Sequence, residues 1–558
     1  MADLGGHPLD QGIVGLLAAY QDGLSPLAVV DEVLARIEAC GDPAIWIDVE
    51  ARSVLRAAAE EMGSTPMDGR PLWGVPFALK DNIDVAGRVT TAGLPAAARV
   101  ADASATVVQR LVAAGGLYVG KTNLDQLATG LVGTRSPYGT PLNPIDPRLI
   151  PGGSSSGSAV AVALGHVSFA LGTDTAGSGR VPAAMCGIVG LKAAPGSRPI
   201  DGIVPASPTL DCVSTFARSV ADGLIVESVL GSPWPVAAGP FVVAVAPGCD
   251  ATEAQLRTGG NRVVSVDLAP FFEAGDLLYG GPWLADRTAA LAGLLGGLPD
   301  GLIEVVQTVV AGGERYSGTE VFAAMQRLSE IRAELAAWWS DVDALILPTV
   351  PWLPTLDEVA ADPIAVNAQL GRNTTFANLL GLAAIAVPAS SGAGGVTVLG
   401  PAGHRGSVAA LAGALHGEGL AEGAEAGLDH VHLAVVGAHL SGQPLNGQML
   451  DQGAEFVART ETAPSYRLYR LNGGPVLRPG LEKVAVGGQA IEVEVWSISA
   501  EGLGRVLAAV APPLGIGSVE LAGGRWVKGF ICETRGLGDA VDITAHGGWR
   551  SYLSSIAG

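Results

Sequence analysis

The chain has 558 residues, which is too long for one ordinary hydrophobic core, so we expect two or more domains. Apolar residues make up 48% and charged residues 16% of the sequence, a balance that is typical of a large globular protein and excludes extensive disorder. The net charge of −21, without clusters of Lys and Arg, argues against nucleic acid as a partner.

The five cysteines are scattered and include no CxxC pair. This pattern indicates free thiols in a reducing compartment and no cysteine-based metal site. The N-terminus lacks a basic stretch followed by an apolar one, and apolar runs such as 158–171 are too short and too rich in Gly and Ala for a membrane span. We therefore expect a cytoplasmic protein without a membrane partner.

Apolar residues at helical spacing predict helices across about residues 10–62. Residues 71–80 are predicted to form a short buried strand that ends in Lys80. A helix over 106–114 and a strand over 117–120 follow. This alternation of strand and helix indicates an α/β core.

Residues 135–153 are rich in proline and are predicted to form turns, and 320–339 is predicted to form a long helix. A Gly-, Ala- and Glu-rich stretch at 416–430 predicts a linker between domains at 1–415 and 431–558. In the second domain, short apolar segments between turn signals predict strands at residues 432–436, 465–469, 491–496 and 526–531.

Two clusters of serine and glycine, at 152–157 and 174–180, lie on either side of an apolar run. Glycines around a serine let backbone N–H groups point into a cavity, as a nucleophile and its oxyanion hole require. The clusters alone leave open which serine attacks and which group takes its proton.

A histidine-dependent hydrolase is one alternative, because residues 153–157 match the pattern G-x-S-x-G with Ser155 at the centre. That motif requires a strand directly before it, whereas a proline-broken loop precedes this one. His166 lies in an apolar run and is expected to be a packed structural residue. A phosphate-binding loop is disfavoured as well, because no lysine follows these glycines.

A system of serine and lysine is the third alternative. Lys80 ends an apolar strand, and burial there would lower its pKa because burial disfavours the ammonium form. A neutral lysine can act as a base near neutral pH. On its own, Lys80 is better explained as an ordinary lysine in water at the end of a strand. Together with the two Ser/Gly clusters, the interpretation of Lys80 as a catalytic base is favoured.

Lys80, the cluster at 153–157 and the segment 172–180 together resemble the amidase signature family, and the resemblance covers about residues 10–415. It implies an α/β fold with a mixed central sheet surrounded by helices, and chemistry without a metal or a cofactor. Ser178 would be the nucleophile. Ser154, held on a cis peptide bond in the family, would relay the proton to Lys80.

The same resemblance implies an oxyanion hole of consecutive backbone N–H groups, those of Thr175, Ala176, Gly177 and Ser178. Alanine stands at position 176 where glycine is frequent in the family, a change that a backbone donor tolerates. Asp174 and Arg180 are expected to form a structural ion pair that braces this loop. Ser155 is expected to orient the relay serine or the lysine.

Two further features narrow the substrate. Arginine suits bidentate recognition of a carboxylate, and Tyr279 and Arg287 lie close together in the sequence, although each is also explained as a packed side chain. Residues 431–557 resemble the C-terminal domain of allophanate hydrolases, and the segment around Tyr279 and Arg287 then resembles the substrate-binding stretch of that family. The implied substrate is allophanate, with Thr129 and Gly130 lining its pocket.

The C-terminal domain is expected to resemble the γ-glutamyl cyclotransferase-like fold, a small α+β barrel. We hypothesise that it assists decarboxylation of the product, with His439 as the candidate residue; the alternative is that it only stabilises a homodimer. No biotin-carboxylase-like segment is visible, so a separate urea carboxylase is expected to supply the substrate. Other hypotheses are an amidase for biuret or simple amides, and an amidotransferase-type subunit.

Overall fold

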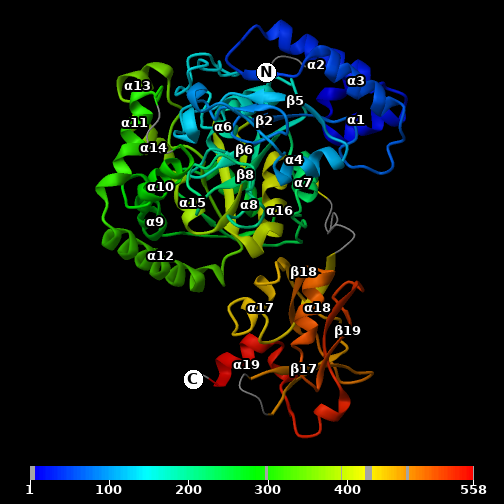
Figure 1. Ribbon diagram of the computed structural model, residues 1–558. Coiled ribbons are helices and arrows are strands. Elements are labelled where there is room, and N and C mark those ends of the chain that lie inside the picture. Colours follow the sequence, from blue (N-terminus) through cyan, green and yellow to red (C-terminus); the bar gives the residue numbers. More distant parts are fainter. Residues whose placement is uncertain (1–6, 296–299, 391, 421–429, 473–476, 557–558) are drawn as a thin grey trace.

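The computed structural model describes the chain except for a few short segments, and the described residues are 7–295, 300–390, 392–420, 430–472 and 477–556. The chain before residue 420 is built around one 11-stranded mixed sheet. The chain after residue 430 forms a five-stranded and a three-stranded sheet, which lie below the large sheet in Figure 1. The predicted α/β class with a mixed central sheet is confirmed.

The helices predicted across residues 10–62 are three, α1 (Gly12–Gln21), α2 (Pro26–Cys40) and α3 (Arg52–Gly63). Helix α2 begins where the Ser25 side chain accepts from the Leu27 N–H, with Pro26 in the first turn, and it ends at Gly41 in the left-handed conformation. A short edge strand, β1 (Trp46–Val49), lies between α2 and α3 and was not predicted.

The 11-stranded sheet has the strand order β1-β5-β2-β6-β8-β7-β12-β13-β11-β9-β10. Its remaining strands are β2 (Pro76–Lys80), β5 (Leu117–Thr122), β6 (Phe169–Asp174), β7 (Val189–Lys192), β8 (Cys212–Ala217), β9 (Val242–Val245), β10 (Arg262–Val264), β11 (Ala344–Pro348), β12 (Leu382–Pro388) and β13 (Gly395–Pro401). The predicted strands that end at Lys80 and at residue 120 correspond to β2 and β5, so both predictions are confirmed.

Helices pack around this sheet (Figure 1). They are α4 (Thr106–Ala113), α5 (Ser156–Ala163), α6 (Val181–Cys186), α7 (Val220–Val229), α8 (Asp250–Thr258), α9 (Ala269–Tyr279), α10 (Leu284–Leu295), α11 (Glu304–Ala311), α12 (Gly318–Trp339), α13 (Leu356–Ala361), α14 (Ala365–Leu370), α15 (Phe376–Leu379) and α16 (Arg405–His416). The predicted helices over 106–114 and 320–339 correspond to α4 and α12. Residues 135–153 contain no helix or strand, as predicted.

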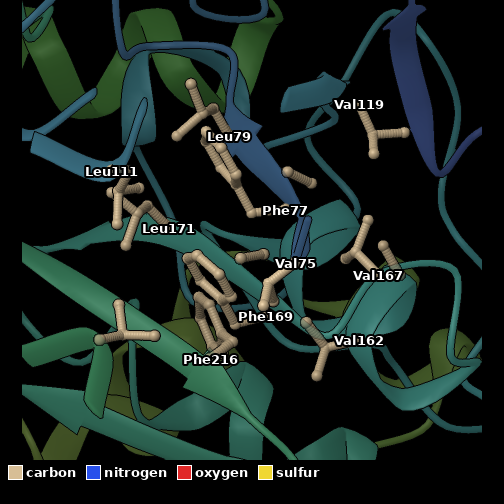
Figure 2. Packing of buried hydrophobic residues seen from close by; sticks show 14 of the residues in the cluster. Val75, Phe77, Leu79, Leu111, Val119, Val162, Val167, Phe169, Leu171 and Phe216 are labelled. Atoms are coloured by element: carbon tan, nitrogen blue, oxygen red, sulfur yellow. The ribbon is translucent and has the colours of Figure 1, made fainter. Parts of the chain in front are cut away.

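Strands β2 and β6 are the third and fourth strands of the sheet, counted from the β1 edge, and they run parallel with Leu79 opposite Leu171. Phe77 and Phe169 stack with ring centroids 5.4 Å apart, and Figure 2 shows them in the buried apolar cluster beside Phe216. Parallel strands end at the same edge of a sheet, so this core brings the C-terminal ends of β2 and β6 together. Lys80 stands at one of these ends, and the segment with the second Ser/Gly cluster begins at the other.

The C-terminal sheets contain β14 (His430–Val435), β15 (Glu455–Glu461), β16 (Tyr466–Arg470), β17 (Pro479–Lys483), β18 (Glu492–Ser499), β19 (Leu514–Glu520), β20 (Trp526–Cys532) and β21 (Val541–Asp542). Helices α17 (Asn446–Leu450), α18 (Ala500–Ala508) and α19 (Trp549–Ile556) pack beside them. The four strands predicted here are all present. The cyclotransferase-like fold stays a prediction. The domain boundaries also stay a prediction, because most of the predicted linker lies outside the described residues.

The two parts of the chain are in contact through a buried ion pair. Arg405 at the start of α16 pairs with Glu455 at the start of β15, and both side chains are less than a tenth exposed. Burial raises the pKa of Glu455 to about 7, although the Arg405 guanidinium opposes this rise. Gly403 packs against the Trp496 ring beside this pair.

No helix within the described ranges is both long and apolar enough to span a bilayer.

Candidate active site

Lys80 is fully buried at the end of β2, and its side chain contacts two hydroxyl groups. Its Nζ lies 2.7 Å from Ser154 Oγ and 2.8 Å from Thr173 Oγ1. Burial lowers the pKa of Lys80 to about 7, against the opposing effect of the carboxylates of Asp125, Asp211 and Asp174. A lysine of this kind is substantially neutral near pH 7 and can accept a proton.

Ser154 lies in a tight turn before helix α5, and the Gly153–Ser154 peptide bond is cis. The backbone holds this turn on both sides, because Gly153 donates to the Leu131 carbonyl at 2.8 Å and the Asp125 N–H donates to the Ser154 carbonyl at 3.0 Å. A Cβ at position 153 would lie 2.1 Å from Asp125 Oδ2, so glycine is required there. The turn thereby directs the Ser154 hydroxyl at Lys80.

Ser178 lies in the loop that follows β6, and it is 3% exposed. Its Oγ is 3.5 Å from the Gly130 carbonyl oxygen, the one hydrogen-bond partner that its side chain has among the described residues. Among the described hydrogen bonds, none joins this hydroxyl to Ser154. Catalytic hydrogen bonds commonly tighten only in the Michaelis complex.

The loop before Ser178 presents backbone N–H groups, as an oxyanion hole requires. Within the described part of the chain, the N–H groups of Thr175, Ala176 and Ser178 have no intramolecular acceptor. The Gly177 N–H was predicted to belong to the oxyanion hole, but it donates to Asp174 Oδ1 at 2.9 Å. Gly177 instead provides the backbone conformation, with φ of +138° and Thr374 Oγ1 only 2.3 Å from where a Cβ would lie.

Asp174 and Arg180 form a fully buried, bidentate ion pair with two contacts of 3.0 Å. Asp174 also accepts from the Gly179 N–H at 2.9 Å, and Arg180 donates to the Thr374 carbonyl at 2.9 Å. Burial alone would raise the pKa of Asp174, but Arg180 and the N–H donors hold it below its usual value. The pair connects both sides of the loop that carries Ser178.

Ser155 is buried, and its hydroxyl donates to the Thr173 carbonyl at 3.2 Å. We predicted that it orients Ser154 or Lys80; the described hydrogen bonds join it to neither. Ser155 and Lys80 instead contact the same residue, Thr173, whose side chain accepts from both Lys80 and Asn82. Strand β6 holds Thr173 in this position.

Three of the predicted substrate-binding residues lie next to one another. Arg287 on α10 is 2% exposed, and its Nη1 donates to Thr129 Oγ1. Gly130 follows Thr129 and accepts from Ser178, so Arg287 is connected to the nucleophile loop through two residues. No carboxylate of the described residues pairs with Arg287 within 4.0 Å. The Tyr279 side chain, at the end of α9, lies outside the described part of the structure.

Several buried residues around the site were not predicted. Asp211 accepts from the Thr175 hydroxyl, and burial raises its pKa. Asp125 accepts from the Gly133 N–H at 3.0 Å and the Arg135 N–H at 2.9 Å, and burial raises its pKa as well. Isolated acidic residues in loops give no pattern by which sequence reasoning could have selected them.

The described residues contain no group of three or more His, Cys, Asp or Glu side chains arranged to hold a metal ion. His166 is 2% exposed, accepts from the Trp46 indole at 3.3 Å, and burial lowers its pKa to about 4. His166 therefore packs as a structural residue against β1, at the edge of the sheet.

His439 lies in the C-terminal part, in a pocket that Arg478 and Phe530 also line. Its ring stacks on Phe530 at 4.8 Å, and its Nε2 is 3.2 Å from Gln448 Oε1. Burial lowers the pKa of His439, so the imidazole is neutral at pH 7. The Arg478 Nε is buried and has no hydrogen-bond partner among the described residues.

The chain matches the family model "Amidase" over residues 28–266 and the model "Allophanate hydrolase C-terminal domain" over residues 431–554. It aligns with the crystal structure of selenomethionine-substituted Kluyveromyces lactis allophanate hydrolase at 36% identity and a TM-score of 0.69, over 98% of this chain and 99% of that one. The chain belongs to the amidase family. It also carries an allophanate hydrolase C-terminal domain.

Two other relatives show how much of this chain, and of each relative, the similarity covers. Urea amidolyase of Saccharomyces cerevisiae is 38% identical, in an alignment that covers 87% of this amidase-family chain and 30% of that protein. The chain thus spans less than a third of the length of that relative. A glutamyl-tRNA(Gln) amidotransferase component from Deinococcus deserti is 31% identical over 71% of this chain and 93% of that component.

Proposed function

We propose that this amidase-family protein hydrolyses allophanate, releasing ammonia and carbon dioxide. The observation that carries the proposal is Arg287, a buried guanidinium that pairs with no carboxylate of the described residues and is connected through Thr129 and Gly130 to Ser178. A buried cation of this kind favours a substrate that brings its own carboxylate. Allophanate has a carboxylate at one end and a terminal amide at the other.

In the proposed mechanism, neutral Lys80 accepts the proton of Ser154, and Ser154 accepts the proton of Ser178. The contact of 2.7 Å between Lys80 and Ser154 supports the first transfer. Ser178 Oγ then attacks the terminal amide carbonyl carbon. The resulting oxyanion accepts hydrogen bonds from the free N–H groups of the loop, each of which contributes about 3 kcal/mol to lowering the barrier.

Collapse of this tetrahedral intermediate breaks the terminal C–N bond. The leaving nitrogen takes the proton back from Lys80 through Ser154 and departs as ammonia. Water then adds to the acyl group on Ser178, with the same pair accepting its proton. The product is N-carboxycarbamate, and the serine is regenerated.

The C-terminal domain is proposed to speed the loss of carbon dioxide from this product. Cationic Arg478, whose Nε has no hydrogen-bond partner in the described part of the chain, and neutral His439 line one pocket. The arginine suits binding of a dianion, and the imidazole suits transfer of a proton to it. Loss of carbon dioxide breaks one C–N bond, and the nitrogen takes up a proton to give carbamate. Carbamate takes up a second proton and decomposes to ammonia and a second carbon dioxide. His439→Gln is expected to leave the first ammonia unchanged and delay the second.

An amidotransferase-type subunit is the less supported alternative, because the Deinococcus relative matches 71% of the chain, whereas the allophanate hydrolase match includes residues 431–554. We further propose that the protein is cytoplasmic and a homodimer. A urea carboxylase activity would supply the substrate, since a carboxylated urea must come from a carboxylation reaction.

The experiment that tests the function is an assay of ammonia release with allophanate, biuret, urea, malonamate and acetamide. We expect the highest kcat/KM with allophanate, some turnover of malonamate because it has the same carboxylate, and little with the uncharged amides. A kcat/KM for biuret or acetamide above that for allophanate would overturn the proposal.

A further inference from the structure

Helix α10 carries Arg287. The residue directly before Arg287, Asp286, joins this helix to a neighbouring loop by hydrogen bonds. Asp286 Oδ2 accepts from the Ser207 hydroxyl, from the Thr209 hydroxyl at 2.8 Å and from the Thr209 N–H at 3.3 Å. The Trp283 indole donates to the same Thr209 hydroxyl at 3.1 Å. The first turn of α10 is therefore held by four hydrogen bonds to residues 207–209.

The other end of this loop holds the nucleophile segment. Asp211 Oδ1 accepts from the Thr175 hydroxyl, and its Oδ2 accepts from the N–H groups of Ala206 at 2.8 Å and Ser207 at 3.0 Å. The Asp211 N–H donates back to the Ser207 carbonyl at 2.9 Å, so the loop is a closed turn. Asp211 is 5% exposed, and Ser207 is 1% exposed.

We propose that residues 206–211 couple the carboxylate-binding arginine to the oxyanion loop, with Asp286, Ser207 and Asp211 as positioning residues. Capture of a carboxylate by Arg287 fixes the start of α10. Asp286 passes this constraint to Ser207, and Asp211 passes it to Thr175, three residues before Ser178. The inference rests on the proposed function, because it requires a substrate whose carboxylate binds Arg287.

The geometry distinguishes this coupling from ordinary support of a helix. Asp286 is the third residue of α10, and the described partners of its carboxylate, Ser207 and Thr209, lie on the loop and not in its own helix. Through this loop, the binding energy of the substrate carboxylate at Arg287 can help to position the oxyanion segment in the transition state. Energy used in this way raises kcat rather than only lowering KM.

A double-mutant cycle with Asp286→Asn and Arg287→Ala tests the coupling with allophanate as substrate. In the native background we expect Asp286→Asn to lower kcat about tenfold and to change KM less than twofold. In the Arg287→Ala background the same change should lower kcat/KM less than twofold. Ser207→Ala removes one hydrogen bond to Asp286 and should also lower kcat, by a smaller factor than Asp286→Asn. Asp276→Asn, on an exposed part of α9, is the control and should leave both constants unchanged.

An equal loss of kcat/KM in both backgrounds would show a structural role and overturn the coupling, as would a loss confined to KM. If Asp286→Asn lowers the yield of folded protein, the Ser207→Ala cycle with Arg287→Ala decides in the same way. Wild-type protein that releases no ammonia from allophanate overturns the proposed function. Normal wild-type turnover with additive variants overturns only the coupling.

Discussion

The Lys80 ammonium nitrogen lies 2.7 Å from Ser154 Oγ, in a position that excludes solvent entirely. Burial makes Lys80 available as a base, because it lowers the pKa of the amine from the ordinary value of 10.5 to about 7. The same burial costs folding free energy, since an ammonium group has to leave water in order to occupy the site.

The first prediction concerns the pH dependence of catalysis. Only the neutral form of Lys80 accepts a proton, so kcat/KM should fall about tenfold per pH unit below pH 7 and level off above it. Measurement of kcat/KM between pH 5.5 and 9 shows this directly. A profile that is flat through pH 7 contradicts the assignment of Lys80 as the base.

The second prediction concerns stability. Lys80→Met removes the buried amine, so it should abolish ammonia release and at the same time raise the Tm by roughly 2 °C or more at pH 7. The sign follows from linkage, because the unfolded chain keeps the proton up to pH 10.5 and the folded chain loses it near 7. The gain in Tm should therefore be largest below pH 7 and disappear near pH 10.5; a lower Tm argues against a buried, desolvated lysine.

The third prediction concerns the brace of the nucleophile loop. Asp174→Asn leaves Arg180 buried without a carboxylate and should lower the free energy of unfolding by about 3–5 kcal/mol. Ammonia release should fall with it, because the loop that presents Ser178 loosens. Denaturant unfolding measures the loss. The matched control is Asp146→Asn, which breaks the exposed pair with Arg148 and should leave the unfolding midpoint unchanged.

The fourth prediction concerns the contact between the two parts of the chain. The pKa of Glu455 is raised to about 7, so its contribution to docking is present at low pH and is lost as the pH rises through 7. Proteolysis in the predicted linker 416–430 should therefore be slower at pH 6 than at pH 8. Glu455→Gln should remove this difference between the two pH values, and Arg405→Met should speed proteolysis at both.

A cleavage rate with the same pH dependence in Glu455→Gln and in the wild type would contradict this account. The control is Arg257→Met, which breaks an exposed pair with Glu253 on α8 and should leave the cleavage rate unchanged.

The contact between Lys80 and Ser154 could be predicted because the motifs that carry the family resemblance are local. Lys80 ends an apolar strand, and the glycines around Ser154 and Ser178 mark turns whose backbone no other residue adopts easily. The short strand β1 was not predicted, because four residues between two helices carry no clear alternation of buried and exposed positions.

The contacts around the triad depend on residues that are distant in the sequence. Thr175 and Asp211 are 36 positions apart, and Ser207 and Asp286 are 79 apart. Such pairs meet only when the sheet and α10 are in place, so periodicity and motif spacing could not identify them. The hydrogen bond from the Gly177 N–H to Asp174 spans only three residues, but it depends on how the closed loop turns, which the motif spacing does not show.

The central claim is that Ser178 attacks the terminal amide of allophanate. The most direct measurement is ammonia release from allophanate by wild-type protein, Ser178→Ala and Ser156→Ala at equal concentrations of folded protein. Ser156 is the matched control, a buried serine of the same region whose hydroxyl has no partner among the described residues. We predict a loss of about 10³-fold or more in Ser178→Ala and wild-type turnover in Ser156→Ala. Turnover by Ser178→Ala within tenfold of the wild type would contradict the account.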